Sequence, residues 1–365
     1  MTFDLNTFDT DAILAKALRG EKPFPDEAIH LAAEGQLLPL AMAAGRIARH
    51  RNPDGKVGYA ISRTVIYSNV CQPNCPFCTG TVTREHPDAF TKTADEVLAE
   101  VAAAVEAGAT QIFLQGGHRI DLDWDYYPGL VRAIHERFPA VQIFAYSPSE
   151  LMVFNVAYQK RSSQVVGELQ DAGMGGLFAG GAETLQSRGP EYRALLRGPW
   201  NEWFDVVHRA VDAGLPVVVP FVFGLGETPR ERVGHLYRVR AVQERTAAAG
   251  KPAFVAMAVF TLPQGLPAAG AEPVQQPSGH EYLRNLALAR VLVPNIAHIQ
   301  SSFVSQGAKV AQVALDGGAD DLGPTHMEYE GVELAAGRTG PMTAEEMERL
   351  IREAGRIPER RTAWS

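Results

Sequence analysis

The chain has 365 residues, with 34 Lys and Arg against 42 Asp and Glu, and a net charge of −8. This acidic balance argues against a nucleic-acid partner, which favours a basic surface. No apolar run approaches the roughly 18 residues of a membrane-spanning helix, and the first residues lack the pattern of a secretory signal. We therefore expect a cytoplasmic protein, without a membrane or nucleic-acid partner, made of one large domain or two small ones.

The first sixty residues have the spacing of amphipathic helices, over 11–18 and 26–50. From there on, short apolar runs alternate with longer amphipathic stretches. The expected strands are 64–67, 111–114, 142–146, 176–178, 217–223, 254–260 and 298–303, with 309–315 either a strand or a helix. The expected helices are 93–107, 126–138, 163–172, 200–213, 229–249 and 281–293.

Several of these helices end in Ala-Gly directly before the next apolar run, as at Gly108, Gly173 and Gly214. Glycine after a helix accepts the left-handed conformation that ends it. The repeated order of helix, glycine and short strand is typical of a parallel α/β protein. Seven or eight such units over about 250 residues predict a closed (β/α)8 TIM-type barrel, with a doubly wound open sheet as the alternative.

The barrel is expected to span residues 56–320, between an N-terminal helical extension over 1–55 and a C-terminal helical extension over 321–365. A helix is predicted over 343–354, because Thr343 and Glu346 have the spacing of a capping box.

All three cysteines lie within eight positions, at Cys71, Cys75 and Cys78. Closely spaced thiolates hold Fe–S clusters, normally four per cluster. A structural zinc site would need a fourth ligand, for which the nearest histidine, His86, is poorly placed. A disulfide framework needs an even number of cysteines in a small secreted chain. The spacing therefore predicts a [4Fe–4S] cluster with one iron left open to a small molecule.

Ligands of a parallel barrel bind at the carboxyl ends of its strands. The second strand ends in Gln115, Gly116 and Gly117, where a backbone can approach a ligand closely or make a tight turn. The third is followed by Ser149 and Glu150, which either face the substrate or cap a helix.

Two further strand ends carry candidates. Glu183, in a glycine-rich segment, is expected to bond a ligand or act as a base, and the alternative is a solvated loop residue. Gly224 is expected to contact a ligand through its backbone, while Glu227 could instead cap the next helix. Polar residues around the second and last strands are candidate contacts for a hydroxylated, anionic substrate, or ordinary surface residues: His118, Arg119, Asp121, Asp123, Gln300, Ser302 and Gln306.

The Cys-x3-Cys-x2-Cys spacing resembles that of the radical SAM superfamily. There the open iron binds the amino and carboxylate groups of S-adenosylmethionine (SAM), and one electron from the cluster releases methionine and a 5′-deoxyadenosyl radical. The resemblance implies a [4Fe–4S] cluster, SAM and an electron donor such as flavodoxin or ferredoxin. It also implies that the end of the second strand, at Gln115, Gly116 and Gly117, binds the methionine part of SAM. Under the same resemblance, Glu183 is expected to bond ribose hydroxyls, and Gly224 to contact the adenosine of SAM.

Further segments resemble one branch of this superfamily, the futalosine-pathway enzymes of menaquinone biosynthesis and the deazaflavin synthase subunits. They include Leu114-Gln-Gly-Gly-His118, Gly180-Gly-Ala-Glu183 and 350–358. Two more, Tyr67-Ser-Asn-Val-Cys71 and Ser147-Pro-Ser-Glu150, are most similar to dehypoxanthine futalosine cyclase. The resemblance implies a nucleoside-like or aromatic small-molecule substrate, from whose ribose the cyclase abstracts a hydrogen. The sister enzyme, aminofutalosine synthase, instead adds the radical itself to its substrate.

Three places depart from the pattern of this branch: Thr79-Gly80, Arg119-Ile120 and Gly224-Leu225. All lie at strand ends, where the substrate is expected, and Leu225 replaces a usual histidine. If the chain is a cyclase, Glu183, Ser149 or Arg119 must supply the missing polar contact, and these are the predicted catalytic residues. A diverged paralogue with another substrate, radical addition, and a non-catalytic Fe–S protein are the alternatives.

Overall fold

The computed structural model describes residues 8–71, 82–180, 200–224, 226–250, 254–261, 277–325 and 342–364. Three helices come first: α1 (Thr10–Leu18), α2 (Pro25–Glu34) and α3 (Leu37–Arg51). The sequence predicted one helix over 26–50, but the chain breaks at Gly35, which has an extended conformation. A Cβ at Gly35 would lie 2.4 Å from the Leu31 carbonyl oxygen, so this tight break requires glycine.

Strands and helices then alternate along the chain. Their bounds are β1 (Lys56–Ala60), β2 (Ser62–Ser68), α4 (Ala94–Glu106), β3 (Gln111–Gly116), α5 (Tyr126–Arg137), β4 (Gln142–Ala145), α6 (Pro148–Ala157), α7 (Ser162–Asp171), β5 (Leu177–Phe178), α9 (Trp200–Asp212), β6 (Val217–Phe223), α10 (Pro229–Ala248), β7 (Phe254–Thr261), α11 (Gly279–Leu292), β8 (His298–Ser301), α12 (Phe303–Gln306), α13 (Ala308–Ala314), β9 (Asp321–Pro324), α15 (Ala344–Glu353) and β10 (Ile357–Arg360).

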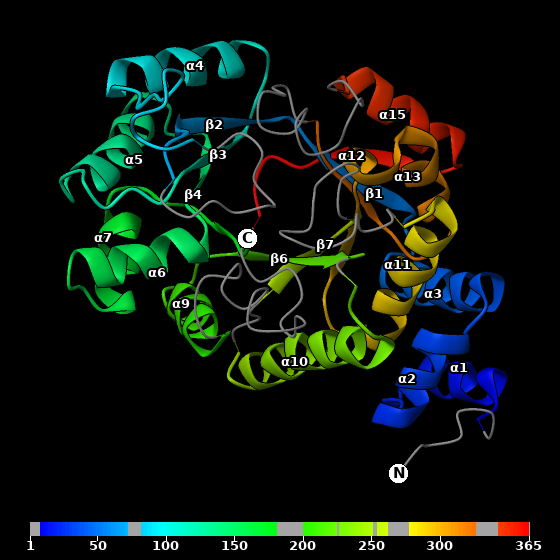
Figure 1. The fold of residues 1–365 in the computed structure, drawn as a ribbon. Helices are drawn as coiled ribbons and strands as arrows, with labels where there is room; N and C mark the ends of the chain where they lie inside the picture. Colours follow the sequence, from blue (N-terminus) through cyan, green and yellow to red (C-terminus); the bar gives the residue numbers. More distant parts are fainter. Residues whose placement is uncertain are drawn as a thin grey trace.

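The strands form a seven-stranded sheet in the order β10-β1-β9-β8-β7-β6-β5 and a three-stranded sheet in the order β2-β3-β4. Every ladder between these strands is parallel. Only Ile61 separates β1 from β2, and a bridge between Phe144 and Gly176 joins β4 to the β5 side. The two sheets therefore curve around one interior, with helices outside (Figure 1). The predicted TIM-type barrel is confirmed, and the open sheet is not seen.

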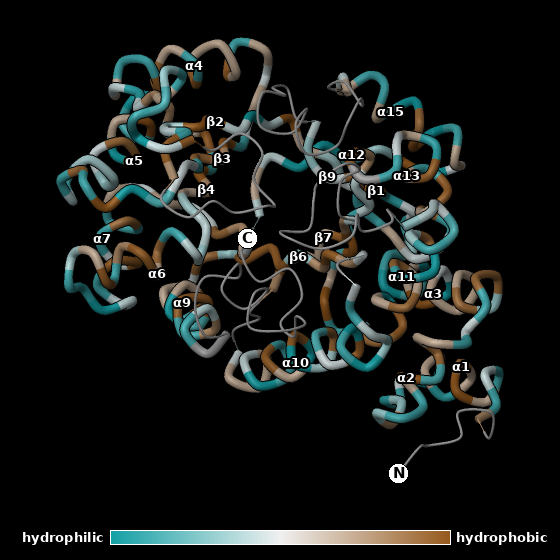
Figure 2. The backbone as a smooth tube through the Cα atoms, viewed as in Figure 1, coloured by the Kyte–Doolittle hydropathy of each residue, from teal (hydrophilic) through white to brown (hydrophobic). Residues whose placement is uncertain are grey.

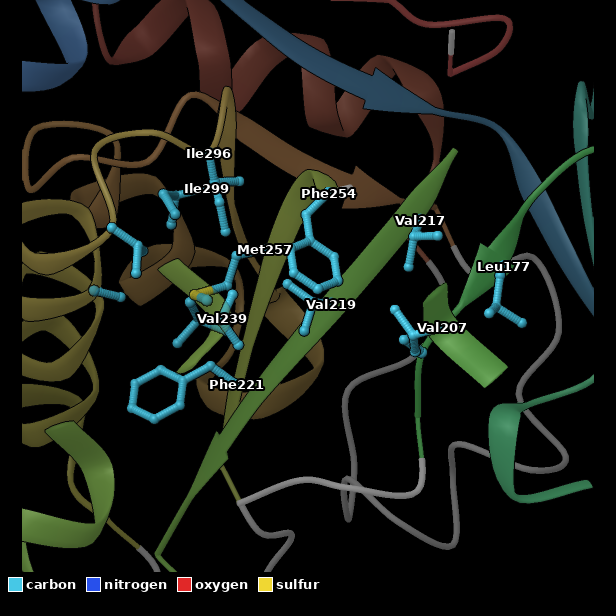
Figure 3. Packing of buried hydrophobic residues seen from close by; sticks show 14 of the residues in the cluster. Leu177, Val207, Val217, Val219, Phe221, Val239, Phe254, Met257, Ile296 and Ile299 are labelled. Atoms are coloured by element: carbon cyan, nitrogen blue, oxygen red, sulfur yellow. The ribbon is translucent and has the colours of Figure 1, made fainter. Parts of the chain in front are cut away.

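Alternate residues of the strands face opposite sides of the wall. Figure 3 shows Val219 and Phe221 of β6 near Met257 of β7 and Val239 of α10, on the side that the helices cover. Val217 of the same strand lies toward Leu177 and Val207. A second cluster, on the interior side, contains Phe144, Val218, Ala256 and Ala258, with Phe113, Phe178, Val255, Phe260 and Trp364 packed against it. The strands are among the most hydrophobic segments, while helices such as α10 alternate hydrophobic and hydrophilic turns (Figure 2).

The strands that the sequence pattern did not predict are β1, β9 and β10. Each is short and carries a residue that disfavours strands: Gly58, Gly323 or Pro358. β10 lies at a sheet edge, where proline is tolerated. The segment 309–315, left open between strand and helix, lies in α13. Among its described residues, the C-terminal extension thus contributes one helix, α15, and two strands, β9 and β10. The division of the chain at 55 and 320 remains a proposal.

No helix among the described ranges is both long and apolar enough to cross a membrane.

A fully buried ion pair fixes the start of β8. Arg290 of α11 lies 2.8 Å from Asp320, through Nη2 and Oδ1, and its other donors bond backbone carbonyls. The same Asp320 oxygen accepts the N–H of Ile299 at 2.8 Å. Burial alone raises the pKa of Asp320, but the charge of Arg290 and the contact with His298 hold that pKa below its ordinary value. The pair therefore stabilises the fold above the ordinary carboxyl pKa, and this contribution is lost as the pH falls.

Replacing Asp320 with Asn is expected to destabilise the protein by about 3–5 kcal/mol, because it leaves the Arg290 charge buried without its partner. Thermal unfolding measures the effect. Glu353→Gln is the matched control: it removes an exposed pair with Arg349 and should change stability by less than about 1 kcal/mol. Equal effects of the two substitutions would contradict the role assigned to the buried pair.

Candidate active site

The cysteine segment begins at the carboxyl end of β2. Cys71 is buried and forms no disulfide. Its Sγ accepts the backbone N–H of His118 at 3.4 Å, while its own N–H donates to the Val82 carbonyl at 3.0 Å. Cysteine sulfurs are the ligands that hold Fe–S clusters, and backbone N–H groups directed at such sulfurs are part of their usual surroundings. This environment fits a cluster ligand. Cys75 and Cys78 lie outside the described residues.

The paired glycines at the end of β3 allow it to pack against this segment. A Cβ at Gly117 would lie 1.9 Å from the Val70 carbonyl oxygen and 3.0 Å from Cys71 Cβ. A Cβ at Gly116 would lie 2.5 Å from the ring of Tyr67. Neither glycine has a positive φ, so the tight-turn alternative does not apply. The close approach seen here is to the chain itself, and the predicted contact of these glycines with a ligand stays a prediction.

A buried carboxylate joins β2, β3 and α6. Glu150 Oε1 accepts the Tyr67 hydroxyl and the Gly116 N–H, both at 3.1 Å. Glu150 Oε2 accepts the N–H and the hydroxyl of Ser147, both at 2.8 Å. The Tyr67 hydroxyl also lies 3.1 Å from the Gly117 carbonyl oxygen. Tyr67 and Glu150 are 0% and 2% exposed. Water therefore does not reach the carboxylate, and these protein donors supply its hydrogen bonds instead.

The same residues begin α6. Ser147 is its N-cap and Glu150 completes a capping box. Of the two alternatives for this segment, the helix cap is present, and the same Glu150 also belongs to the buried hydrogen-bonded network with Tyr67. Binding of a polar substrate here stays a prediction. Ser149, a predicted catalytic residue, is buried beside them, and its Oγ lies 2.9 Å from Ser147 Oγ and 3.4 Å from His118 Nε2.

Burial shifts the titration of this network. It raises the pKa of Glu150 to about 7, although the hydrogen bonds from Ser147, Tyr67 and Gly116 lower it. Burial, followed by the nearby Glu150, raises the pKa of Tyr67 well above its ordinary value. The phenol therefore keeps its proton and remains a donor, while the carboxyl group titrates near neutral pH.

Tyr146 follows β4 with a φ of 65°, which is unusual for a bulky residue. Its ring packs edge-on against Tyr67, with centroids 5.6 Å apart, and its hydroxyl donates to the Tyr127 carbonyl at 2.9 Å. Such a backbone conformation costs about 1–3 kcal/mol and tends to occur near functional sites. The sequence pattern, which placed Tyr146 in a strand, contained no signal for it.

Arg119, another predicted catalytic residue, is buried and bonded within the protein. Its Nε and Nη2 donate to the two carboxylate oxygens of Asp121, at 2.6 and 2.7 Å. Its Nη1 donates to the hydroxyls of Ser68 and Thr91. The side chain thus connects the loop after β3 to the end of β2, and a contact with substrate stays a prediction.

Gly224 lies at the end of β6 with a φ of 92°. Its N–H donates at 3.1 Å to Glu227 Oε1, which also accepts Arg232 Nε at 2.7 Å. The cap of α10 is Thr228, so Glu227 holds the Gly224 turn and does not begin the helix. Glu183 and Leu225 lie outside the described residues, and their roles stay predictions.

Of the three predicted polar residues near β8, two have side chains bonded within the described part of the protein and one does not. Gln300 donates to Asp321 at 2.9 Å, and Gln306 donates to the Thr261 hydroxyl at 3.1 Å. Ser302 Oγ is buried without a hydrogen-bond partner among the described residues.

Comparison with known proteins matches two sequence profiles. The profile of the radical SAM superfamily matches residues 65–238, and that of the CofH/MqnC C-terminal region matches residues 270–364. Over the whole fold, the structure is similar to HydG, a maturase of the [FeFe]-hydrogenase, with a TM-score of 0.73 and 18% identity over 97% of this chain and 77% of that one.

The curated relatives include enzymes with three different names. A cyclic dehypoxanthine futalosine synthase of Halalkalibacterium halodurans is 31% identical over 96% of this chain and 93% of its own. An aminodeoxyfutalosine synthase of Thermus thermophilus is 31% identical, with coverages of 89% and 87%. A 5-amino-6-(D-ribitylamino)uracil–L-tyrosine 4-hydroxyphenyl transferase of Methanopyrus kandleri is 32% identical, with coverages of 91% and 90%. Because this likeness extends over nearly its whole length, the chain belongs to the radical SAM superfamily.

Proposed function

We propose that this enzyme abstracts a hydrogen atom from a nucleoside-like small molecule and so drives formation of a carbon–carbon bond, as a futalosine cyclase does. Radical SAM enzymes use a [4Fe–4S] cluster and SAM. Cys71, Cys75 and Cys78 are the proposed cluster ligands, and a flavodoxin or ferredoxin is the proposed electron donor. An oxygen-sensitive cluster favours the cytoplasm.

Identity alone does not choose among the activities, since relatives with different names are about equally similar. The observation that carries the proposal is the hydrogen bond of 3.1 Å between Tyr67 and Glu150. Each residue belongs to one of the two segments that most resemble the cyclase, Tyr67-Ser-Asn-Val-Cys71 and Ser147-Pro-Ser-Glu150. The two segments are far apart in the sequence and form one connected unit, which supports a shared role in the cyclase-like reaction.

The Tyr67–Glu150 unit suits the task of positioning. Its bonds hold Gly116 and Gly117 beside Cys71, where the methionine part of SAM is proposed to bind. When bound, the reduced cluster and SAM supply a 5′-deoxyadenosyl radical. The remaining task of the chain is to hold one substrate C–H in reach and to exclude water. Positioning of this kind can contribute roughly 7–11 kcal/mol.

Ser149 and His118 are the proposed contacts for a substrate hydroxyl, since both are buried and lie together at the ends of β3 and β4. Glu183 is proposed to bond ribose hydroxyls, and Gly224 to contact the adenosine of SAM.

The reaction type is tested by product analysis. If the radical abstracts hydrogen, 5′-deoxyadenosine should accumulate one-for-one with product, and deuterium placed on the substrate ribose should appear in it. Mass spectrometry of anaerobic reactions with candidate nucleosides measures both. An adenosyl group covalently attached to the product would instead assign the radical-addition reaction.

Gly117→Ala should lower the iron content below the approximately four irons per chain of a complete cluster. The added methyl would overlap the Val70 carbonyl, so the Cys71 segment must move. Iron analysis after anaerobic reconstitution measures the loss. Gly129→Ala is the control, because nothing lies within 4 Å of a Cβ there, and it should keep the full iron load. Equal iron in both variants would refute the packing argument.

Glu150→Gln should change how stability depends on pH. The raised pKa means that the folded protein holds a proton that the unfolded chain releases, between the ordinary glutamate value of 4.5 and about 7. Wild-type stability from this group is thus fully present below pH 4.5 and is lost as the pH rises towards 7. Urea unfolding measures the free energy of unfolding of both proteins at several pH values in this range. This free energy should fall with rising pH in the wild type and should fall less in Glu150→Gln. Parallel curves would be inconsistent with a raised pKa.

A further inference from the structure

Residues 361–364 leave the wall and enter the barrel at the end opposite Cys71. The Arg361 N–H donates to the Tyr59 carbonyl at 2.7 Å, and its own carbonyl accepts the Thr110 hydroxyl at 3.4 Å. Trp364 exchanges two hydrogen bonds with Gln142, at 2.8 and 2.9 Å. Thr110 directly precedes β3 and Gln142 begins β4, so the segment crosses the amino ends of the strands. Figure 1 shows this red stretch running from the wall to the centre of the ring.

Trp364 continues the apolar lining of the barrel. Its side chain packs against the interior cluster that contains Phe144, Val218, Ala256 and Ala258. Its ring also lies 5.3 Å from the ring of His298, at the start of β8. Because contacts reach both β4 and β8, the segment spans the interior.

An interior ion pair connects this segment to the inner wall. Arg361 Nη1 pairs with Asp321 of β9, and its guanidinium lies 3.8 Å from the centre of the Trp364 ring. Asp321 is 1% exposed, and its Oδ1 accepts the Gln300 side-chain amide at 2.9 Å. On β1, a Cβ at Gly58 would lie 2.3 Å from Asp321 Oδ2, so glycine leaves room for the carboxylate. Asp321 thus connects the other two residues: it pairs with Arg361 and accepts a hydrogen bond from Gln300.

We propose that residues 361–364 are the floor of the reaction chamber, and that Arg361 is a positioning residue that acts through Asp321 to hold Gln300 for the substrate. The inference rests on the proposed function, because it requires a nucleoside inside the barrel. A glutamine amide both donates and accepts hydrogen bonds, which suits a hydroxyl or carbonyl group of such a molecule. Small displacements from the reactive geometry slow a reaction strongly, so a loose floor should let SAM be cleaved without product.

The test compares Arg361→Met and Arg361→Lys with the wild-type enzyme, reconstituted and supplied with SAM and the substrate found by product analysis. Arg361→Met should raise the ratio of 5′-deoxyadenosine to product several-fold and raise KM, while SAM affinity is unchanged. Arg361→Lys, which keeps the charge, should restore part of the coupling. Glu359→Gln is the matched control. Glu359 lies two residues before Arg361 and forms an exposed ion pair with Lys56, so its replacement should leave the enzyme as the wild type.

Hydrogen–deuterium exchange of the proteins without cofactors gives a readout independent of activity. In Arg361→Met, the amides at 142–145 and 298–301 should exchange faster, because the segment that covers both strand starts is released. If these amides exchange in Arg361→Met as they do in the wild type, residues 361–364 are not the floor of the chamber. If they exchange faster but 5′-deoxyadenosine and product still form one-for-one, Arg361 is not a positioning residue.

A second variant covers the case in which Arg361→Met fails to fold. Gln300→Leu leaves the floor in place and should uncouple the reaction without faster exchange at 142–145; full coupling in this variant overturns the proposal. Failure of the proposed function looks different, since the wild-type enzyme itself would then release no 5′-deoxyadenosine.

Discussion

The close approach of the ends of β2 and β3 is the constraint on which the site depends. The Tyr67 ring and the Val70 carbonyl occupy the space that side chains at positions 116 and 117 would need. With glycine there, the His118 N–H reaches Cys71 Sγ and the Gly116 N–H reaches Glu150. One packing contact therefore connects the segment that is proposed to hold the cluster to the buried carboxylate.

The barrel separates two tasks along its axis. Its mouth carries the hydrogen-bonded network around Glu150, whose pKa of about 7 leaves it partly neutral at neutral pH. Its opposite end carries Asp321, paired with Arg361, and between them lies an apolar lining. Hydrogen-atom transfer moves no net charge, so it needs positioning more than electrostatic stabilisation. In the proposed chamber the ion pair lies at one end and the lining is apolar, which suits chemistry that depends on positioning.

The sequence predicted what depends on local pattern. The bounds of β6 match the expected 217–223, and Gly108 and Gly214 have the positive φ expected after helices. It could not predict contacts between distant residues: Tyr67 and Glu150 are 83 positions apart, and Arg361 and Asp321 are 40 apart. Sequence position also gave no sign that Arg119, after β3, pairs with its own neighbour Asp121, and its predicted contact with substrate stays a prediction. Strands β9 and β10 form in spite of Gly323 and Pro358, because the wall supplies their partners.

The central claim is that Tyr67 and Glu150 act as one unit in preparing the site for SAM. It is tested most directly by measuring SAM affinity of the reconstituted wild-type enzyme, of Tyr67→Phe, of Glu150→Gln and of the double variant. Residues in one hydrogen-bonded network typically show interaction energies of about 0.5–3 kcal/mol in such a cycle. We expect each single change to weaken SAM binding, and the second change to add little to the first. Additive losses, or wild-type affinity in all three variants, would contradict it.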